Sequence, residues 1–269
     1  MYKLLVTDLD GTLLDDHGRL PAVNREYIKL LTERGVQVAL CSGRSYLSLA
    51  RFETMLGLDK PGCYGICFNG GIVYDSFSKE IISDIRMGRD VTIELADEIK
   101  RVMSDPDLGI GIYVGGVLYS EPASDAISRY ACKSGIETTT VDSFSEITDD
   151  PSKIVLRGEN APLREVYNGL EEFVKGKCRM YFTSEFLLEL IPLDSGKGRG
   201  LCILAEKLNI PVSETIAAGD QINDIDMLQA AGMGVAVANA VSEVKAAADY
   251  IARANNNEGI IKEIAERFF

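Results

Sequence analysis

The sequence has few basic residues and no long apolar run, and these two absences exclude several kinds of partner. Its 269 residues include 28 Lys and Arg against 41 Asp and Glu, for a formal net charge of −13. Nucleic acids and anionic membrane surfaces are bound through concentrated basic patches, which this sequence lacks. No apolar stretch approaches the roughly 20 residues of a membrane-spanning helix, and the first residues turn acidic before a signal-peptide core could form. We therefore expect a cytoplasmic protein that binds neither nucleic acid nor membrane.

Histidine and cysteine are also too few or too scattered for most metal chemistry. The only histidine, His17, lies in a polar segment and is expected at the surface, which disfavours histidine phosphatases and zinc hydrolases. The six cysteines form no Cys-x-x-Cys pair, and we expect small buried side chains rather than metal ligands or disulfides. Neither a Walker phosphate loop nor a Gly-x-Gly-x-x-Gly motif is present.

Both ends of the chain have the alternation that is typical of a parallel sheet with helices between its strands. Short apolar runs predict the strands, and segments with helical periodicity separate them. The predicted strands are Lys3–Thr7, Val36–Leu40, Gly65–Phe68, Thr215–Ala218 and Val235–Val237. The first helix is predicted to bury a stripe of Val23, Tyr27, Leu30 and Leu31. The two ends of the chain are expected to build one sheet.

The middle of the chain has a different pattern. Strands predicted at Ile110–Val114 and Val117–Tyr119 flank a tight Gly-Gly connection, which is typical of an antiparallel sheet. The length of 269 also exceeds one average domain of roughly 100–200 residues. The predicted fold class is α/β: a Rossmann-like parallel sheet core with helices on both faces (residues 1–83 and 191–269) and an inserted α+β cap domain with an antiparallel sheet (residues 84–190).

Two carboxylates follow the first predicted strand, in the segment Asp8-Leu9-Asp10-Gly11-Thr12. On an extended chain, residues two apart point to the same side, and Gly11 lets the chain turn directly afterwards. Two like charges about 4 Å apart repel by about 4 kcal/mol at an effective dielectric constant near 20. Asp8 and Asp10 therefore require a cation or a shared proton.

A second acidic segment, Asp220 to Asp224, also follows an apolar strand. The carboxyl ends of parallel strands meet at one edge of a sheet, where ligands bind in open α/β folds. Oxygen ligands without cysteine or histidine suit Mg²⁺. Either acidic segment alone would more commonly be a helix cap or an Asx turn, but two such segments favour a metal site.

Two further segments offer groups that bind anions. Ser42-Gly43-Arg44 follows the second strand and begins a helix, so a hydroxyl and backbone N–H groups are expected at the same edge. Ser42 is equally compatible with a simple helix cap. Lys197 lies among glycines before another helix and can reach the same place, although a lone lysine is more commonly a solvated surface charge.

These four segments, in this order, resemble the motifs of the haloacid dehalogenase-like (HAD) hydrolases, most closely the Cof-type phosphatase branch. The segment around Asn69 and the closing stretch from Ala248 to Gly259 also look like that branch. The resemblance covers essentially the whole chain, with the cap inserted between the second and third motifs. Ser42 stands where many members have threonine, which keeps the hydroxyl.

The resemblance implies a role for each matching residue. Asp8 would be the nucleophile that forms an aspartyl phosphate, and Asp10 would be the general acid and then the general base. Mg²⁺ would be held by the side chains of Asp8 and Asp220 and by the backbone carbonyl of Asp10. The phosphate-binding groups would be the N–H groups of Leu9 and Gly43 and the side chains of Ser42, Lys197 and Asn223. Asp224 would orient Lys197 or a water on the metal, and Arg44 and Asn69 are possible substrate contacts.

The implied function is hydrolysis of small phosphate esters such as sugar phosphates, with phosphorylated cofactors as further candidates. The inserted cap would close over the site and exclude water. A phosphomutase that acts on sugar phosphates, or a receiver-like signalling domain with a phosphorylated aspartate, would use similar residues. The sequence specifies neither the substrate nor the choice between a monomer and a small homo-oligomer.

Overall fold

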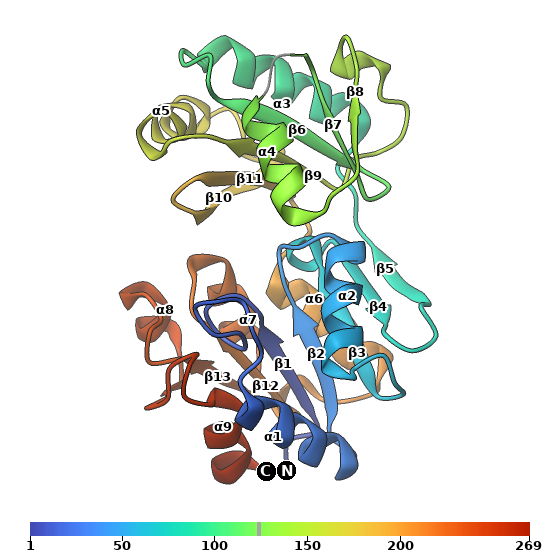
Figure 1. The fold of residues 1–269 in the computed structure, drawn as a ribbon, viewed down its shortest axis with the longest axis vertical. Helices are drawn as coiled ribbons and strands as arrows, with labels where there is room; N and C mark the ends of the chain where they lie inside the picture. The colour runs from blue at the N-terminus through green and yellow to red at the C-terminus, as the bar shows by residue number, and fades with distance from the viewer. Residues whose placement is uncertain (123–124) are drawn as a thin grey trace. The chain divides into compact units, whose positions relative to one another are not determined.

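Both ends of the chain contribute strands to one eight-stranded sheet, and the middle of the chain forms a second sheet (Figure 1). The computed structural model describes residues 1–122 and 125–269. Unit 1 consists of Met1–Asp84 and Gly196–Phe269, and unit 2 consists of Ile85–Ser195. The boundary expected at residues 190 and 191 falls inside the strand Leu187–Pro192, which pairs with strands of unit 2.

The sheet of unit 1 has the strand order β14-β13-β12-β1-β2-β3-β4-β5. Its strands are β1 (Leu4–Asp8), β2 (Gln37–Cys41), β3 (Cys63–Cys67), β4 (Ile72–Asp75), β5 (Ile81–Asp84), β12 (Thr215–Gly219), β13 (Met233–Ala236) and β14 (Tyr250–Ile251). The pairs from β14 to β3 are parallel, and β4 and β5 are antiparallel additions at one edge. The sequence prediction did not include this edge hairpin.

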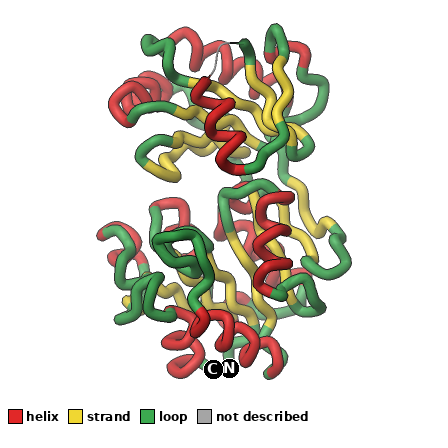
Figure 2. Tube along the Cα trace, viewed as in Figure 1, coloured by secondary structure: helices red, strands yellow, loops and turns green. Residues whose placement is uncertain are grey.

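The helices of unit 1 lie on both faces of its sheet (Figures 1 and 2). They are α1 (Ala22–Glu33), α2 (Tyr46–Leu56), α6 (Lys197–Lys207), α7 (Ile225–Ala230), α8 (Ser242–Ala247) and α9 (Ile260–Phe268). The chain proceeds from β1 to β2 in one direction and from β12 to β13 in the other. Because β-α-β crossovers are right-handed, the intervening helices α1 and α7 cover opposite faces. The strand order reverses between β1 and β12. This switch point is where α/β folds bind ligands.

Helix α1 buries the predicted apolar stripe only in part. Its buried residues are Asn24, Ile28 and Leu31, while the other predicted positions are only partly buried. The Asn24 side chain donates to the carbonyl of Leu13 at 3.0 Å and accepts the N–H of Ile261 at 3.0 Å. A polar side chain is tolerated in a core when its hydrogen bonds are satisfied, so Asn24 occupies a buried position that the apolar pattern did not include.

The six-stranded sheet of unit 2 has the order β10-β11-β9-β6-β7-β8. Its strands are β6 (Gly109–Val114), β7 (Val117–Ser120), β8 (Thr138–Thr140), β9 (Lys153–Arg157), β10 (Cys178–Ser184) and β11 (Leu187–Pro192), and its helices are α3 (Arg89–Val102), α4 (Asp125–Ser134) and α5 (Asn160–Leu170). Pairing is antiparallel except between β7 and β8. Alternate residues of β6, β9 and β11 pack against α3 and α5 in one apolar core. Across the described residues, every helix is too short or too polar to cross a membrane.

Candidate active site

The two predicted acidic segments meet at the carboxyl ends of β1 and β12. These strands pair in parallel, with Thr7 opposite Ala218, so the residues that follow them emerge side by side. Asp8 is the last residue of β1, and Asp220 follows the last residue of β12 directly. The Thr12 hydroxyl, in the turn after β1, donates to the Asp220 carboxylate at 2.8 Å.

Lys197 lies between two aspartates at the centre of this edge. Its ammonium nitrogen is 2.5 Å from Oδ1 of Asp8 and 2.5 Å from Oδ1 of Asp224. The side chain of Lys197 is 1% exposed, and those of Asp8 and Asp224 are 8% and 1% exposed. Lys197 is the first residue of α6, so the helix that links unit 2 back to the sheet places this charge. We call Asp8, Lys197, Asp220 and Asp224 the carboxylate cluster.

Asp224 has both carboxylate oxygens occupied within the protein. Oδ1 contacts Lys197, and Oδ2 accepts the backbone N–H groups of Asp220 and Gln221, each at 2.9 Å. Gly219 makes this turn possible, because a Cβ there would lie 2.5 Å from the Cβ of Asp224. Asp224 therefore fixes both the Lys197 ammonium and the turn that carries Asp220.

The carboxylate cluster buries more negative charge than positive charge. Burial raises the pKa of the Asp8 carboxyl well above its usual value, Lys197 opposes this rise, and the carboxylates of Asp224, Asp220 and Asp10 add to it. Burial, followed by the charge of Asp224, raises the pKa of Asp220 to about 6. Burial disfavours the Lys197 ammonium, but Asp224 and Asp8 outweigh it and raise its pKa. The pKa of Asp8 therefore differs from that of an ordinary aspartate mainly because of burial, which the sequence alone does not show.

The geometry of the carboxylate cluster fits a divalent cation. Asp8, Asp220 and Asp224 can each offer a carboxylate oxygen within 4.8 Å of the other two. These are the hard oxygen donors that Mg²⁺ prefers. The contacts of Asp224 with Lys197 and two N–H groups leave Asp8 and Asp220 as the better ligands.

Asp10 does not join the buried cluster. The chain turns after Asp8, because the Leu9 carbonyl accepts the N–H groups of Leu13 at 3.0 Å and Leu14 at 2.9 Å. The extended geometry expected for Asp8 and Asp10 therefore ends at Asp8. The Asp10 side chain is 56% exposed and is held by Arg44, whose Nε and Nη2 donate to its two oxygens at 2.9 and 2.7 Å.

The predicted anion-binding loop lies beside β1. Strand β2 pairs with β1 so that Cys41 is opposite Asp8, and Ser42 and Gly43 follow at the same edge. Ser42 is buried, and its hydroxyl oxygen accepts the N–H of Arg44 at 3.3 Å. Asn223, in the short helix Ile222–Asp224, is linked to this loop through Asn69.

Three contacts of the site were not predicted. Thr12 holds Asp220, the Asn239 side chain donates to the Gly11 carbonyl at 2.7 Å, and Asp226 accepts the N–H of Gly198 at 3.2 Å. Thr12 and Asp226 lie within two residues of predicted site residues, so proximity to the motifs was an available signal. Asn239 carries no such signal, since it follows β13 and lies 228 positions from Gly11.

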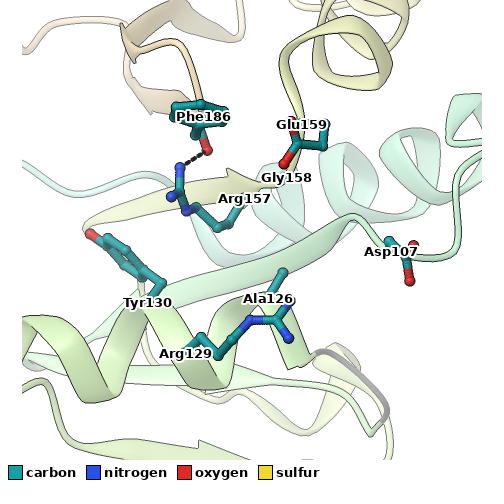
Figure 3. A pocket seen from close by; sticks show the side chains of 8 residues that line it. All are labelled: Asp107, Ala126, Arg129, Tyr130, Arg157, Gly158, Glu159 and Phe186. Carbon is teal, nitrogen blue, oxygen red and sulfur yellow. Dashed lines mark hydrogen bonds between the residues drawn. The ribbon is translucent and has the colours of Figure 1, made fainter.

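Unit 2 contains a separate cavity of about 560 Å³ (Figure 3). It is lined by Asp107, Ala126, Arg129, Tyr130, Arg157, Gly158, Glu159 and Phe186. Arg157 donates to the Phe186 carbonyl, and its guanidinium carbon lies 5.2 Å from the centre of the Phe186 ring. None of the residues predicted for catalysis, phosphate binding or metal binding lines this cavity, so it is not the candidate active site.

Comparisons with known proteins identify the family of this chain and agree with its fold. The family model for haloacid dehalogenase-like hydrolases matches residues 5–264. A Bacillus subtilis protein named "Putative phosphatase YxeH" is 32% identical over 99% of this chain and 98% of its own length. A phosphoglycolate phosphatase from Methanopyrus kandleri is 30% identical over 97% of this chain and 94% of its own. The crystal structure of a haloacid dehalogenase-like hydrolase from Bacteroides thetaiotaomicron superposes with a TM-score of 0.86 over 100% of both chains, at 31% identity.

Proposed function

Because the chain belongs to the haloacid dehalogenase-like hydrolase family, we propose that it is a Mg²⁺-dependent phosphatase of small phosphorylated metabolites. The observation that carries the proposal is the carboxylate cluster, in which three buried carboxylates lie close together and two of them contact one ammonium group. Such a site attracts a cation, and with the cation bound it attracts a phosphate ester. The names of the Bacillus subtilis and Methanopyrus kandleri relatives support phosphatase activity.

In the proposed reaction an oxygen of Asp8 attacks phosphorus and the bond to the leaving alkoxide breaks. Asp10 gives its proton to that alkoxide, then takes a proton from the water that attacks the aspartyl phosphate, which releases inorganic phosphate and restores Asp8. Arg44 occupies both oxygens of Asp10 and has to release at least one of them for this proton transfer. Lys197 holds the attacking carboxylate in place and offsets charge on the phosphoryl oxygens.

Mg²⁺ would be held by the side chains of Asp8 and Asp220 with the backbone carbonyl of Asp10, and it would supply positive charge between nucleophile and phosphate. Ser42, Asn223 and the N–H groups of Leu9 and Gly43 would bind the remaining phosphoryl oxygens. The proposed substrates are sugar phosphates and similar small phosphate esters.

The test is phosphate release from a panel of metabolite esters, with Mg²⁺ and with a chelator, for the wild type and for Asp8→Asn. We expect release that requires Mg²⁺, and a loss of at least about 10³-fold in kcat/KM for Asp8→Asn, because the amide cannot attack phosphorus. Asp59→Asn, at an exposed position outside the site, serves as the matched control. An Asp8→Asn protein that releases phosphate at the wild-type rate would refute the assignment.

The same experiment separates the two alternative functions. A phosphomutase would isomerise a sugar phosphate when a hexose bisphosphate is supplied, with little free phosphate. A receiver-like domain would accumulate a long-lived phosphoprotein that Asp8→Asn abolishes. Rapid multiple turnover with stoichiometric release of phosphate argues against both.

A further inference from the structure

The turn that follows β3 packs among the proposed phosphate-binding segments. It is the short helix Phe68–Gly70, in which Asn69 has a φ of +53° and no exposed surface. Non-glycine residues seldom adopt positive φ, and asparagine is among those that tolerate it best. A strained, fully buried polar residue at this position calls for a physical reason.

The side chain of Asn69 is bonded to a proposed phosphate ligand. Oδ1 of Asn69 accepts a hydrogen bond from Nδ2 of Asn223 at 3.0 Å. The terminal amide of an asparagine rotates over a broad range when nothing holds it. The hydrogen bond therefore fixes the orientation of the Asn223 amide group, with its Nδ2 atom towards Asn69.

The backbone of the same turn is bonded to the Ser42–Arg44 loop. The N–H of Asn69 donates to the Ser42 carbonyl at 3.0 Å, and the N–H of Phe68 donates to the Arg44 carbonyl at 2.9 Å. The Asn69 amide also lies against Gly43, where an added Cβ would be 3.1 Å from its Nδ2. These two backbone hydrogen bonds hold the Ser42–Arg44 loop at its first and its last residue.

The turn also contacts the segment before Lys197. A Cβ on Gly70 would lie 1.9 Å from the Gly196 carbonyl oxygen, so the two backbones are in direct contact. Gly70 has a φ of +87°, which glycine adopts without strain. A single turn therefore touches the Ser42 loop, Asn223 and the approach to Lys197.

We propose that Asn69 is a positioning residue, which orients the Asn223 amide and holds it in register with the Ser42–Arg44 loop. This inference rests on the proposed phosphatase function. Asn69 was also expected as a possible substrate contact, and that expectation stays a prediction; the hydrogen bond from Asn223 to its carbonyl oxygen is the basis of the positioning role. With this positive φ, Asn69 makes both the side-chain bond with Asn223 and the backbone bond to the Ser42 carbonyl.

The test is a double-mutant cycle of Asn69→Gly and Asn223→Ala. Glycine keeps the positive φ and removes only the side chain, so the variant isolates the hydrogen bond to Asn223. The matched control is Asn209→Gly, since Asn209 also has a φ of +53° but is exposed at the end of α6. The readouts are kcat, KM and the dissociation constant of orthovanadate, a phosphate mimic whose binding does not require turnover.

We expect Asn69→Gly to lower kcat and weaken vanadate binding by about tenfold, the effect of roughly one oriented hydrogen bond to a charged ligand. Asn209→Gly should leave both values unchanged. In the double variant the loss should match that of Asn223→Ala alone, because Asn69 acts through Asn223.

Two results would overturn the positioning role. Losses that multiply in the double variant would mean that Asn69 acts independently of Asn223. An Asn69→Gly protein with wild-type kcat and vanadate affinity would mean that the contact is only structural. Failure of the proposed function has a different signature, because the wild type itself would then neither release phosphate nor bind vanadate.

Discussion

Two buried lysines, one in each unit, contact different numbers of buried carboxylates. In unit 2 the ammonium of Lys153, on β9, is 2.5 Å from Glu189, on β11, and their side chains are 2% and 3% exposed. The Tyr113 ring centre lies 5.3 Å from the same ammonium. In unit 1 the ammonium of Lys197 is shared between Asp8 and Asp224, with Asp220 close by.

The difference shows that burial of charge alone does not identify a functional site. The Lys153–Glu189 pair sets one positive charge against one negative charge across neighbouring strands, which is the arrangement of a structural ion pair. The carboxylate cluster buries three carboxylates around one ammonium, and it leaves an excess of negative charge that the protein itself does not neutralise. The charge imbalance of the carboxylate cluster indicates a cation-binding site more specifically than its burial does.

The largest effect is expected from Lys197→Met. The substitution leaves the carboxylate cluster with no positive charge and removes the group that holds Asp8. We expect kcat/KM for phosphate release to fall by at least about 10³-fold, because an interaction with both the nucleophile and the phosphoryl group is lost. Steady-state kinetics at saturating Mg²⁺ measures the loss. Activity within tenfold of the wild type would contradict a catalytic role for Lys197.

The corresponding change in unit 2, Lys153→Met, should affect stability instead. It removes the Lys153 ammonium from the buried ion pair with Glu189, and the loss of one member of a buried pair typically costs about 3–5 kcal/mol of unfolding free energy. Urea denaturation measures that cost, and kcat per folded molecule should remain at the wild-type value.

The double variant Lys153→Met/Glu189→Leu is the control for this interpretation. Replacing both charges with apolar side chains of similar size should restore most of the lost stability, because no buried charge is left unpaired. A double variant no more stable than Lys153→Met would show that packing, not charge, explains the loss. A fall in kcat would instead give Lys153 a function.

The sequence predicted the elements whose residues are buried on both sides. All five residues of β1 are buried, and the predicted strand Ile110–Val114 lies in β6 (Gly109–Val114), which is buried throughout. The hairpin of β4 and β5 was not predicted, because β5 is at most half-buried and its pattern resembles a loop. Its turn did carry a signal, since Asp75 accepts the N–H groups of Phe77 and Ser78 as in an Asx turn.

The site was predictable where position on a strand decides geometry. Asp8, Asp220 and Ser42 each lie at the carboxyl end of a parallel strand, so topology alone brings them to one edge. The partners of Asp10 and Asn69 were not predictable, because a side-chain hydrogen bond between distant segments leaves no periodic pattern. Asn69 and Asn223 are 154 positions apart, and neither residue type indicates the other.

The smallest effect, and one of opposite sign, is expected from Asp220→Asn. The folded-state pKa of Asp220 is raised from 3.8 to about 6, so the folded protein binds this proton more tightly than the unfolded chain does. Its contribution to stability is therefore present below pH 4 and is lost as the pH rises to about 6. At neutral pH the ionised, buried Asp220 costs up to roughly 3 kcal/mol in the absence of metal. The neutral amide avoids that cost, and its oxygen can still accept the hydrogen bond from Thr12.

In a chelator, Asp220→Asn should be more stable than the wild type above pH 6, with the difference disappearing towards pH 4. Thermal unfolding across this pH range measures the difference, and added Mg²⁺ should stabilise the wild type much more than the variant because a ligand has been removed. Thr215→Ser, which keeps a hydroxyl on the same strand β12 away from its carboxyl end, is the matched control. A variant that is less stable than the metal-free wild type at neutral pH would show that Asp220 is adequately compensated by Thr12 and Gln221. In that case the contrast between the carboxylate cluster and the Lys153–Glu189 pair would not be one of charge balance.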